Sequence, residues 1–263
     1  MLTINDMKQI TLDERKKILL DMLSEFQDFC IDNELKYSLA FGTLLGAIRH
    51  KGYIPWDDDV DISMPLEDIH KLKQIFHSDN LKISDNDSEP YYQQVFPRIS
   101  HNQSFMKRGL IVKSYGINID LYPLIEVSNS DEEIERIHQL ALPLIARKRH
   151  LQTLRSRLIR FFPIKNIPGY VPACNAYRDL MLKELPCPGS GRFFFVAGRW
   201  ALFYKHVVDF NPFDELIDVD IEDRKFLAPA RYDEILHTRY GDYMQLPPED
   251  ERHPYHGGTY YWR

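Results

Sequence analysis

The sequence has few cysteines, and no two of them are close together. Cys30, Cys174 and Cys187 are the three in 263 residues, and none belongs to a Cys-x-x-Cys pair. Such spacing argues against a disulfide framework and against a zinc site, and it is typical of a reducing compartment. We therefore expect a cytoplasmic protein.

A membrane-spanning run and a signal peptide are also missing. The longest apolar stretch, Phe193 to Val208, is interrupted by Arg199 and Lys205 and is too short to cross a bilayer. We interpret it as a buried helix. The first residues lack the charged-then-apolar pattern of a signal peptide. The hydrophobic content of 44% is enough for a sizeable core.

Acidic residues are absent from one long segment. Between Glu135 and Asp179 the sequence has nine lysines and arginines but no acid, although the net charge is −6. Its part over 147–165 has the pattern of a basic amphipathic helix, which suits peripheral contact with an anionic membrane at the inner face. The alternatives are a solvated helix face and a nucleic-acid interface. We expect no nucleic acid, because the segment lacks interleaved glycines and aromatics.

Acids crowd together elsewhere, in the stretch from Phe41 to Ile62. It opens with Gly42 and Thr43, between an expected strand over 37–41 and an expected short helix over 44–48. Glycine lets a backbone approach a ligand closely, and threonine is a good helix N-cap. The free amides of such a turn favour a phosphate.

Four carboxylates then fall within five positions, at Asp57, Asp58, Asp59 and Asp61. Acids packed this closely repel one another, and a cation among them relieves the repulsion. On an extended strand Asp57, Asp59 and Asp61 share one face and Asp58 lies on the other. Asp59 and Asp61 are then candidate ligands for Mg²⁺, with Mn²⁺ as an alternative. Taken singly, Asp57 and Asp58 resemble solvated turn residues.

A third carboxylate stands on a later strand. Apolar residues alternate with polar ones over 115–121, which places Asp120 on the polar face just before a Tyr-Pro dipeptide. Asp59, Asp61 and Asp120 are our candidate metal-binding and catalytic residues. Arg49, Lys51 and Arg98 are candidate donors to phosphate oxygens.

The order of expected elements defines the fold class. Helices are expected over 12–34, 66–77, 131–161, 174–185, 192–207 and 229–240, and strands over 81–84, 92–99, 104–110 and 115–121. We predict an α+β fold with a mixed sheet flanked by helices and a mainly helical C-terminal half. Residues 1–128 would form the catalytic core, and residues 129–263 a helical region that completes the site.

These motifs together resemble a known family. A Gly-Thr turn, an Asp-x-Asp pair and a lone later Asp are similar to the nucleotidyltransferase superfamily. More narrowly, GTLLGAIRHKGYIPWDDDVDI resembles the signature of the LicD family of phosphorylcholine transferases, to which fukutin-related proteins are also similar. NIDLYPL and LPPEDERHPYH resemble further LicD blocks. The resemblance covers about residues 36–125 and returns near 240–256. The zinc-binding cysteines of some fukutin-related proteins are not matched.

The resemblance implies a nucleotidyltransferase-like core and a defined reaction. LicD proteins move the phosphorylated part of a CDP-activated small group, typically CDP-choline, onto a hydroxyl of a surface glycan such as lipopolysaccharide, and release CMP. By this resemblance Asp59, Asp61 and Asp120 hold the metal, and Gly42 and Thr43 contact the nucleotide phosphates. The acceptor is a glycan or a lipid-linked glycan.

Choline would be bound best by an aromatic cage. Candidate cage residues are Tyr53, Trp56, Tyr255 and Trp262. Two other functions remain open at this point. A metal-dependent glycosyltransferase also uses an Asp-x-Asp pair to hold a nucleoside-diphosphate sugar, but has a larger parallel sheet with alternating strands and helices. A non-catalytic nucleotide-binding protein is the second alternative.

Overall fold

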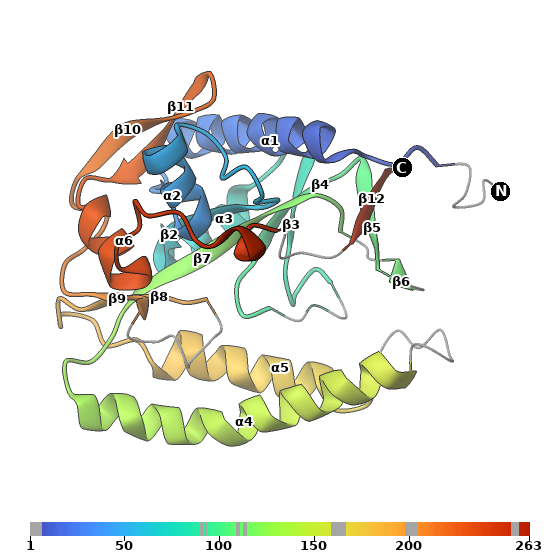
Figure 1. Cartoon of the computed structure of the whole chain (residues 1–263). Helices are drawn as coiled ribbons and strands as arrows, with labels where there is room; N and C mark the ends of the chain where they lie inside the picture. The colour runs from blue at the N-terminus through green and yellow to red at the C-terminus, as the bar shows by residue number, and fades with distance from the viewer. Residues whose placement is uncertain are drawn as a thin grey trace.

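The structure, a computed structural model, describes residues 7–89, 92, 94–108, 111–112, 115–158, 167–197, 205–253 and 258–263. Its centre is a mixed sheet of seven strands, with helices above, behind and below it (Figure 1). The helices are α1 (Leu12–Asp32), α2 (Phe41–His50), α3 (Leu66–Ile75), α4 (Asp131–Leu158), α5 (Tyr170–Asp179), continued by a π-helical turn over Leu180–Glu184, and α6 (Tyr232–Tyr240).

The sheet is built around one long strand. Its members are β1 (Ser38–Leu39), β2 (Val60–Pro65), β3 (Leu81–Ser84), β4 (Arg98–His101), β7 (Asn118–Glu126), β8 (Phe193–Phe195) and β9 (Val207–Val208). β2 runs parallel to β7, whereas β4 and β8 both pair antiparallel with β7, at its first and last residues respectively. The strand order is β1-β2-β7-β4-β3, and β9 extends the sheet beyond β8.

Two small sheets flank this core. β10 (Leu216–Ile221) and β11 (Arg224–Pro229) form a hairpin, and β12 (Thr259–Trp262) pairs with β5 (Ser104–Arg108), which pairs with β6 (Ile111–Val112). A backbone hydrogen bond from Ile10 to the Tyr260 carbonyl, 2.8 Å long, joins β12 to the entry of α1. The end of the described chain therefore lies against its beginning.

α1 shows how local sequence sets a helix that the core then holds. Thr11 caps it as predicted: its hydroxyl accepts from the Glu14 amide at 3.2 Å, and the Glu14 carboxylate accepts from the Thr11 amide at 2.9 Å. The buried stripe of α1 packs into the main core with Val60, Ile62 and other apolar residues of β2 and β7. This fixes α1 against the strands that carry the acids.

α4 and α5 form a separate layer below the sheet and run side by side in opposite directions (Figure 1). A second apolar core joins this layer to the sheet, with Ile134 and Ile137 of α4 packed against Ile125 of β7 and Phe194 of β8. α4 continues through Pro143 for 28 residues. Among the described residues, Ile134, Ile137 and Ala141 place α4 against the sheet, and Leu151 and Leu158 place it against α5.

The predicted α+β class is confirmed, but three local predictions are wrong. The helix expected over 192–207 is replaced, in its described part, by the antiparallel strands β8 and β9. A run such as Phe193 to Phe195 suits a buried strand as well as a helix, and sheet pairing decides between them. β7 does not end at Leu121 but continues past Pro123. The β10–β11 hairpin was missed, and α6 starts at Tyr232 because Pro229 ends β11.

The described part of the chain contains no helix that is both long and apolar enough to cross a membrane.

Candidate active site

The candidate site begins where α2 follows β1. The helix starts at Phe41, with Ala40 as its N-cap, so the prediction of Thr43 as N-cap is wrong. The Thr43 hydroxyl instead accepts a hydrogen bond of 2.8 Å from the backbone amide of Asp61, which ties α2 to β2. The first amides of a helix have no partner within it, so the start of α2 offers donors to an anion.

Gly42 lies in this first turn, directly beneath the Asp57 side chain. A methyl group added at Gly42 would come within 2.8 Å of the Asp57 Oδ2 atom. The lack of a side chain at Gly42 therefore lets the Asp57 carboxylate approach the first turn of α2 closely, and no unusual backbone angle is involved. The neighbouring Phe41 has the unusual angle, with φ of 44°, which is uncommon for a residue with a side chain.

Asp58 is buried and ion-paired, and the prediction of a solvated turn residue is wrong for it. It is 3% exposed, and its Oδ2 atom accepts a hydrogen bond of 2.8 Å from Nη1 of Arg15 on α1. The Arg15 guanidinium also lies 4.2 Å from the ring centre of Tyr260 on β12. Arg15 thus joins the acidic loop to α1 and to the C-terminal strand.

Asp61 and Asp120 lie opposite each other on the parallel strands β2 and β7. Adjacent strands are about 4.8 Å apart, so these two side chains project from neighbouring positions of one sheet face. Burial raises the pKa of Asp61 well above its ordinary value, and the charges of Asp59, Asp120 and Asp57 raise it further. The charges of these carboxylates therefore act on Asp61 together. The period-2 prediction for Asp57, Asp59 and Asp61 is wrong in one respect, because β2 begins at Val60 and the loop before it brings Asp58 next to Asp57 and Asp59.

Arg98 fixes the orientation of Asp120. It lies on β4 opposite Asp120, and its Nε and Nη2 atoms lie 2.6 and 3.1 Å from the two carboxylate oxygens. Asn118 also donates to Oδ1 of Asp120 at 2.7 Å. Burial alone would lower the pKa of Arg98, but the Asp120 charge raises it well above its ordinary value. Arg98 therefore stays charged beside the acids.

Arg49 and Lys51 are placed differently from Arg98. The Nη1 atom of Arg49 donates to the carbonyl of Tyr243, 2.7 Å away, so Arg49 attaches α2 to the segment after α6. Lys51 ends α2 in the left-handed conformation with an exposed side chain. Of the three predicted phosphate donors, Arg98 is the one that contacts a predicted metal ligand.

An aromatic cluster beside the acids was missed by the sequence analysis. The Phe41 ring lies 4.7 Å from that of Tyr122 and 5.0 Å from that of the buried His206. Burial raises the pKa of the Tyr122 phenol, and the charges of Asp61 and Asp120 raise it further, so Tyr122 faces the acids. Tyr122 lies in the NIDLYPL block, which resembles the LicD family, whereas His206 lies in no motif of the sequence.

Tyr240, at the end of α6, also borders the site. Burial of its hydroxyl raises the phenol pKa, and the charges of Asp61 and Asp57 contribute. The residue as a whole remains 39% exposed, so it lies at the rim of the site. The weaker LicD-like block that starts near residue 240 was the sequence signal for this rim.

The three cage candidates that the structure describes are dispersed. The Tyr53 hydroxyl donates to the Lys16 carbonyl at 3.1 Å, and the Trp56 ring lies 5.7 Å from the Arg252 guanidinium. Trp262 lies on β12 beside His101, and Tyr255 lies outside the described residues. Tyr122 and Tyr240 are the tyrosines whose pKa values are raised by the Asp61 charge.

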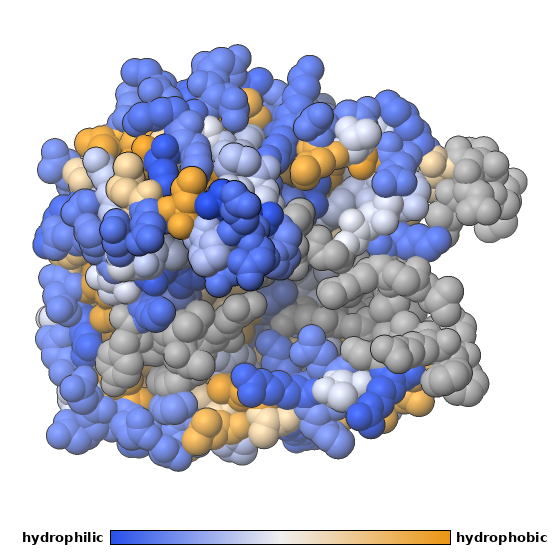
Figure 2. Space-filling model, in the orientation of Figure 1, coloured by the Kyte–Doolittle hydropathy of each residue, from blue (hydrophilic) through white to orange (hydrophobic). Residues whose placement is uncertain are grey.

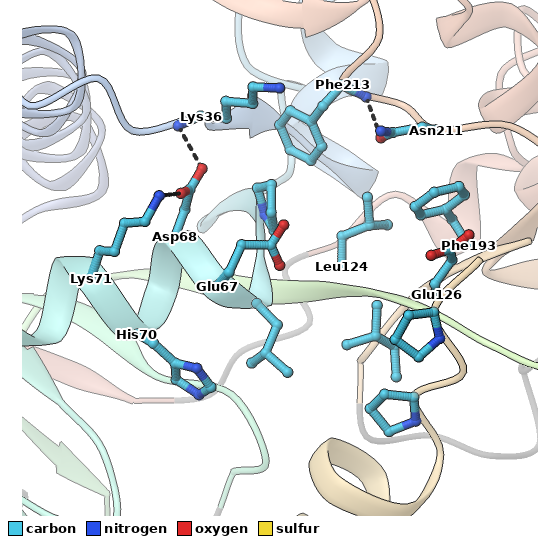
Figure 3. Close-up of a pocket in the computed structure, with 15 residues that line it drawn as sticks. Lys36, Glu67, Asp68, His70, Lys71, Leu124, Glu126, Phe193, Asn211 and Phe213 are labelled. Atoms are coloured by element: carbon cyan, nitrogen blue, oxygen red, sulfur yellow. Dashed lines mark hydrogen bonds and ion pairs between the residues drawn. The ribbon is translucent and has the colours of Figure 1, made fainter. Parts of the chain in front are cut away.

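A cavity of about 550 Å³ lies elsewhere, at the carboxyl ends of β2 and β7, four residues beyond Asp61 and Asp120 (Figure 3). Its two acids that are not exposed, the buried Asp68 and the half-buried Glu126, already have hydrogen-bond donors. Asp68 accepts from the Lys36 amide and from Lys71, and Glu126 accepts from the amides of Gly189 and Gly191. None of the clustered acids lines this cavity, so we assign the chemistry to the acids.

The donor set fits a divalent cation. One oxygen from each of Asp57, Asp58 and Asp59 lies within 4.8 Å of the others. Among the described residues, the buried Oδ1 atom of Asp61 has no hydrogen-bond partner. A buried carboxylate oxygen without a donor, surrounded by like charges, is costly unless a cation binds it. Asp58 is paired with Arg15 and Asp120 with Arg98, and Asp61 lies within the field of Asp57, Asp59 and Asp120.

Comparisons with known proteins define the class of this site. Residues 34–157 match the family model described as the LicD/FKTN/FKRP nucleotidyltransferase domain. The matched segment, just under half of the chain, is therefore similar to a LicD-type nucleotidyltransferase domain, in line with the sequence resemblance. All the predicted site residues lie inside the matched range, whereas α6 and β12 lie outside it.

Individual relatives agree with this class. The chain is 26% identical to the lipopolysaccharide cholinephosphotransferase LicD of Haemophilus influenzae over 95% of this chain and 97% of that protein. Over a shorter stretch, 16% of this chain and 8% of the relative, it is 49% identical to the human ribitol 5-phosphate transferase FKRP. An uncharacterized protein of Rickettsia typhi is 33% identical over 41% of this chain and 31% of its own length. Two of these three relatives are named as transferases of phosphorylated groups.

Proposed function

We propose that this protein transfers a phosphorylated small group, phosphocholine or a close analogue, from a CDP-activated donor to a hydroxyl of a cell-surface glycan. The reaction releases CMP and depends on Mg²⁺. The observation that carries the proposal is that Asp61 lies opposite Asp120 on adjacent parallel strands, with a buried Asp61 oxygen that has no donor among the described residues. The named transferase relatives support the reaction class.

Asp59, Asp61 and Asp120 would hold the metal ion, with Asp57 beside them. When bound, Mg²⁺ supplies positive charge to the diphosphate and to the departing CMP. The first amides of α2, around Gly42 and Thr43, would donate to the donor phosphates. An acceptor oxygen bonds to the phosphorus next to the small group as the bond from that phosphorus to the CMP oxygen breaks.

The remaining residues would position these groups. Arg98 holds Asp120 through both carboxylate oxygens and adds a fixed positive charge. Asp120 is then either a ligand of the metal or the acceptor of the hydroxyl proton. Tyr122 and the rim residue Tyr240 would present aromatic faces to the cationic end of a choline group. Lys51, exposed at the end of α2, stays a candidate donor to the phosphates.

The sheet favours this reaction over glycosyl transfer. The glycosyltransferase alternative predicts a larger parallel sheet with alternating strands and helices. β2 and β7 are instead the one parallel pair among the strand pairings of the described residues. We therefore retain the glycosyltransferase and the non-catalytic nucleotide-binding protein only as outcomes of the test below.

The test measures the nucleotide released from a panel of donors by the purified full chain with Mg²⁺. The panel contains CDP-choline, CDP-ethanolamine, CDP-glycerol, CDP-ribitol and UDP-sugars, each with simple glycosides as acceptors. We expect CMP, and we expect Asp61→Asn to reduce its release at least about a hundredfold, because preorganised charge stabilisation is lost. Release of UDP would replace the proposal by glycosyl transfer. Tight binding of a nucleotide without turnover would indicate a non-catalytic binding protein.

A further inference from the structure

The outward side of α4 carries exposed arginines next to exposed leucines. Six of its exposed residues between positions 140 and 157 are arginines or leucines, and we call these six the α4 outer face. They are Leu140, Leu142, Arg147, Arg149, Leu154 and Arg157. The three leucines are 49%, 43% and 38% exposed. In Figure 2, hydrophobic and hydrophilic residues are interspersed along the lower edge, where Figure 1 places α4.

The packing of α4 explains why this face points outward. Ile134, Ile137 and Ala141 are buried in the core shared with the sheet, and Leu151 and Leu158 pack against α5. These positions define the inner side of the helix. The outer face is the side that remains after both contacts are made. It extends for about 25 Å along the helix, from Leu140 to Arg157.

Lys148 shows that the basic residues are sorted between the two sides. Its ammonium lies 5.5 Å from the ring centre of Tyr177 on α5, and burial lowers its pKa. Arg147, Arg149 and Arg157 are exposed, although the Arg147 guanidinium also lies near Gly169 at the start of α5, and the Arg149 charge opposes the rise that burial causes in the pKa of the Tyr177 phenol. Within the part of the chain that the structure describes, none of these three arginines takes part in a salt bridge. Their charges are therefore available to a partner.

Ordinary explanations do not account for this face. Acidic residues make up 39 of 263 positions, about one in seven, yet none occurs between Glu135 and Asp179. A solvated helix usually mixes both signs of charge. The helix dipole favours bases only in the last turn, whereas Arg147 and Arg149 are in the middle of α4. The first turn, by contrast, holds Asp131, Glu132 and Glu133.

We propose that the α4 outer face docks this protein on the surface of an anionic lipid bilayer. Arginines interspersed with exposed leucines allow electrostatic attraction to acidic headgroups and shallow insertion of apolar side chains. The acidic first turn of α4 is repelled by the same surface, so the contact is made from Leu140 onward and not by the start of the helix. Arg160, Phe161 and Phe162, which the sequence analysis included in the segment over 147–165, lie outside the described residues, and the proposal does not use them.

The test measures binding of the full chain to sedimented vesicles of phosphatidylcholine, with and without one-third phosphatidylglycerol. We expect binding only with the anionic lipid, and we expect added salt to weaken it. The Arg149→Gln/Arg157→Gln variant should bind about 25-fold more weakly, because each arginine near such a surface contributes about fivefold. Glutamine keeps the helix propensity, so the circular dichroism spectrum should not change.

A matched control removes two exposed charges from the other edge of the molecule. Lys17 on α1 and Lys225 on β11 are exposed, and Lys17→Gln/Lys225→Gln should change vesicle binding less than about twofold if the contact is local. An equal loss in both variants, or equal binding to neutral vesicles, would overturn the proposal. Binding to a duplex oligonucleotide at a salt concentration where vesicles are not bound would identify a nucleic-acid interface instead.

Vesicle binding requires no turnover, so this test is independent of the proposed reaction. Release of CMP from a water-soluble donor should be unchanged in Arg149→Gln/Arg157→Gln, because both residues are far along the chain from the acids and lie in another layer (Figure 1). An inactive protein that still binds anionic vesicles would refute the proposed reaction and leave the docking surface intact.

Discussion

Asp58 and Asp61 are three positions apart and both buried, yet their surroundings are opposite. Asp58 has a guanidinium partner 2.8 Å away in Arg15. Asp61 has Asp59 and Asp120 as neighbours and an oxygen without a donor. The first arrangement stabilises the folded chain, and the second destabilises it until a cation binds. Substituting each acid by its neutral amide should therefore have opposite effects.

We expect Asp58→Asn to lower the free energy of unfolding by about 3 kcal/mol, because it leaves the buried Arg15 guanidinium without a counter-charge. Urea denaturation followed by circular dichroism measures the change. The double variant Arg15→Met/Asp58→Asn should recover part of the loss, since no buried charge remains. A loss below about 0.5 kcal/mol in the single variant, the range of surface substitutions, would show that the pair is solvated.

Asp61→Asn should raise the free energy of unfolding in metal-free buffer by about 1–2 kcal/mol, as is common when a strained active-site charge is removed. Asparagine has the same shape, and its uncharged amide removes repulsion from Asp59 and Asp120. The same denaturation experiment in the presence of a chelator measures the effect. A metal-free variant less stable than the native chain would mean that Asp61 is already compensated.

At the scale of single elements, α2 carries two glycines for two different reasons. A methyl group at Gly42 would meet the Asp57 carboxylate at 2.8 Å, which is the end of a flexible side chain. At Gly46 it would meet the backbone oxygen of Gly52 at 2.6 Å and the amide of Ile54 at 3.2 Å. The Asp57 side chain can move, whereas the backbone of Gly52 and Ile54 cannot move without displacing the loop that leads to the acids.

We expect Gly42→Ala to leave the free energy of unfolding unchanged or raised by up to about 1 kcal/mol, because alanine is the better helix former. CMP release should nevertheless fall by about a hundredfold, since the methyl group displaces Asp57 and occupies space needed by the phosphates. Gly46→Ala is the matched control and should lose about 1–3 kcal/mol of stability through overpacking. If Gly42→Ala kept full activity, the phosphates would not approach this turn.

The elements that the sequence predicted well are those with strong local signals. The Thr11–Glu14 capping box sets the start of α1, and alternation around Asp120 indicates the strand that carries it. Local signals did not predict β7 beyond Leu121. Pro123 has no amide proton and is read as a strand breaker, yet β7 continues because β2 on one edge and β8 on the other hold it.

In the candidate site, too, the residues with a local sequence signal were predicted and their partners from distant parts of the chain were not. Asp59 and Asp61 were singled out because crowded like charges favour a cation, and Asp120 because it is an acid on the polar face of a later strand; their role as metal ligands stays a prediction. The partners of Asp58 and Asp120 were not, because Arg15 and Arg98 are 43 and 22 positions away along the chain. His206 reaches the site only through tertiary packing, which no local pattern in its own segment encodes, whereas Tyr240 lies at the start of the weaker LicD-like block.

For the whole molecule, the arrangement of charge implies that a bound cation would stabilise the folded chain. The acids that converge near Gly42 come from β2, β7 and the loop before β2, and α1 and β12 hold that loop through Arg15. A cation at this point would therefore connect elements from both ends of the chain. Its effect should be visible in global stability and not only in turnover.

We expect Mg²⁺ at about a hundredfold excess over its dissociation constant to stabilise the folded chain by about 2.7 kcal/mol, since only the folded chain gathers the acids. For a chain of this size that corresponds to a rise in Tm of about 5–10 °C. Differential scanning fluorimetry with chelator, Mg²⁺ or Mn²⁺ measures this rise in Tm.

Two variants serve as controls. Mg²⁺ should raise the Tm of Asp58→Asn as much as that of the native chain, from a lower starting Tm, because Asp58 pairs with Arg15. Mg²⁺ should not raise the Tm of Asp61→Asn. An equal shift in Asp61→Asn would place the ion elsewhere and remove the basis for assigning the chemistry to Asp61 and Asp120.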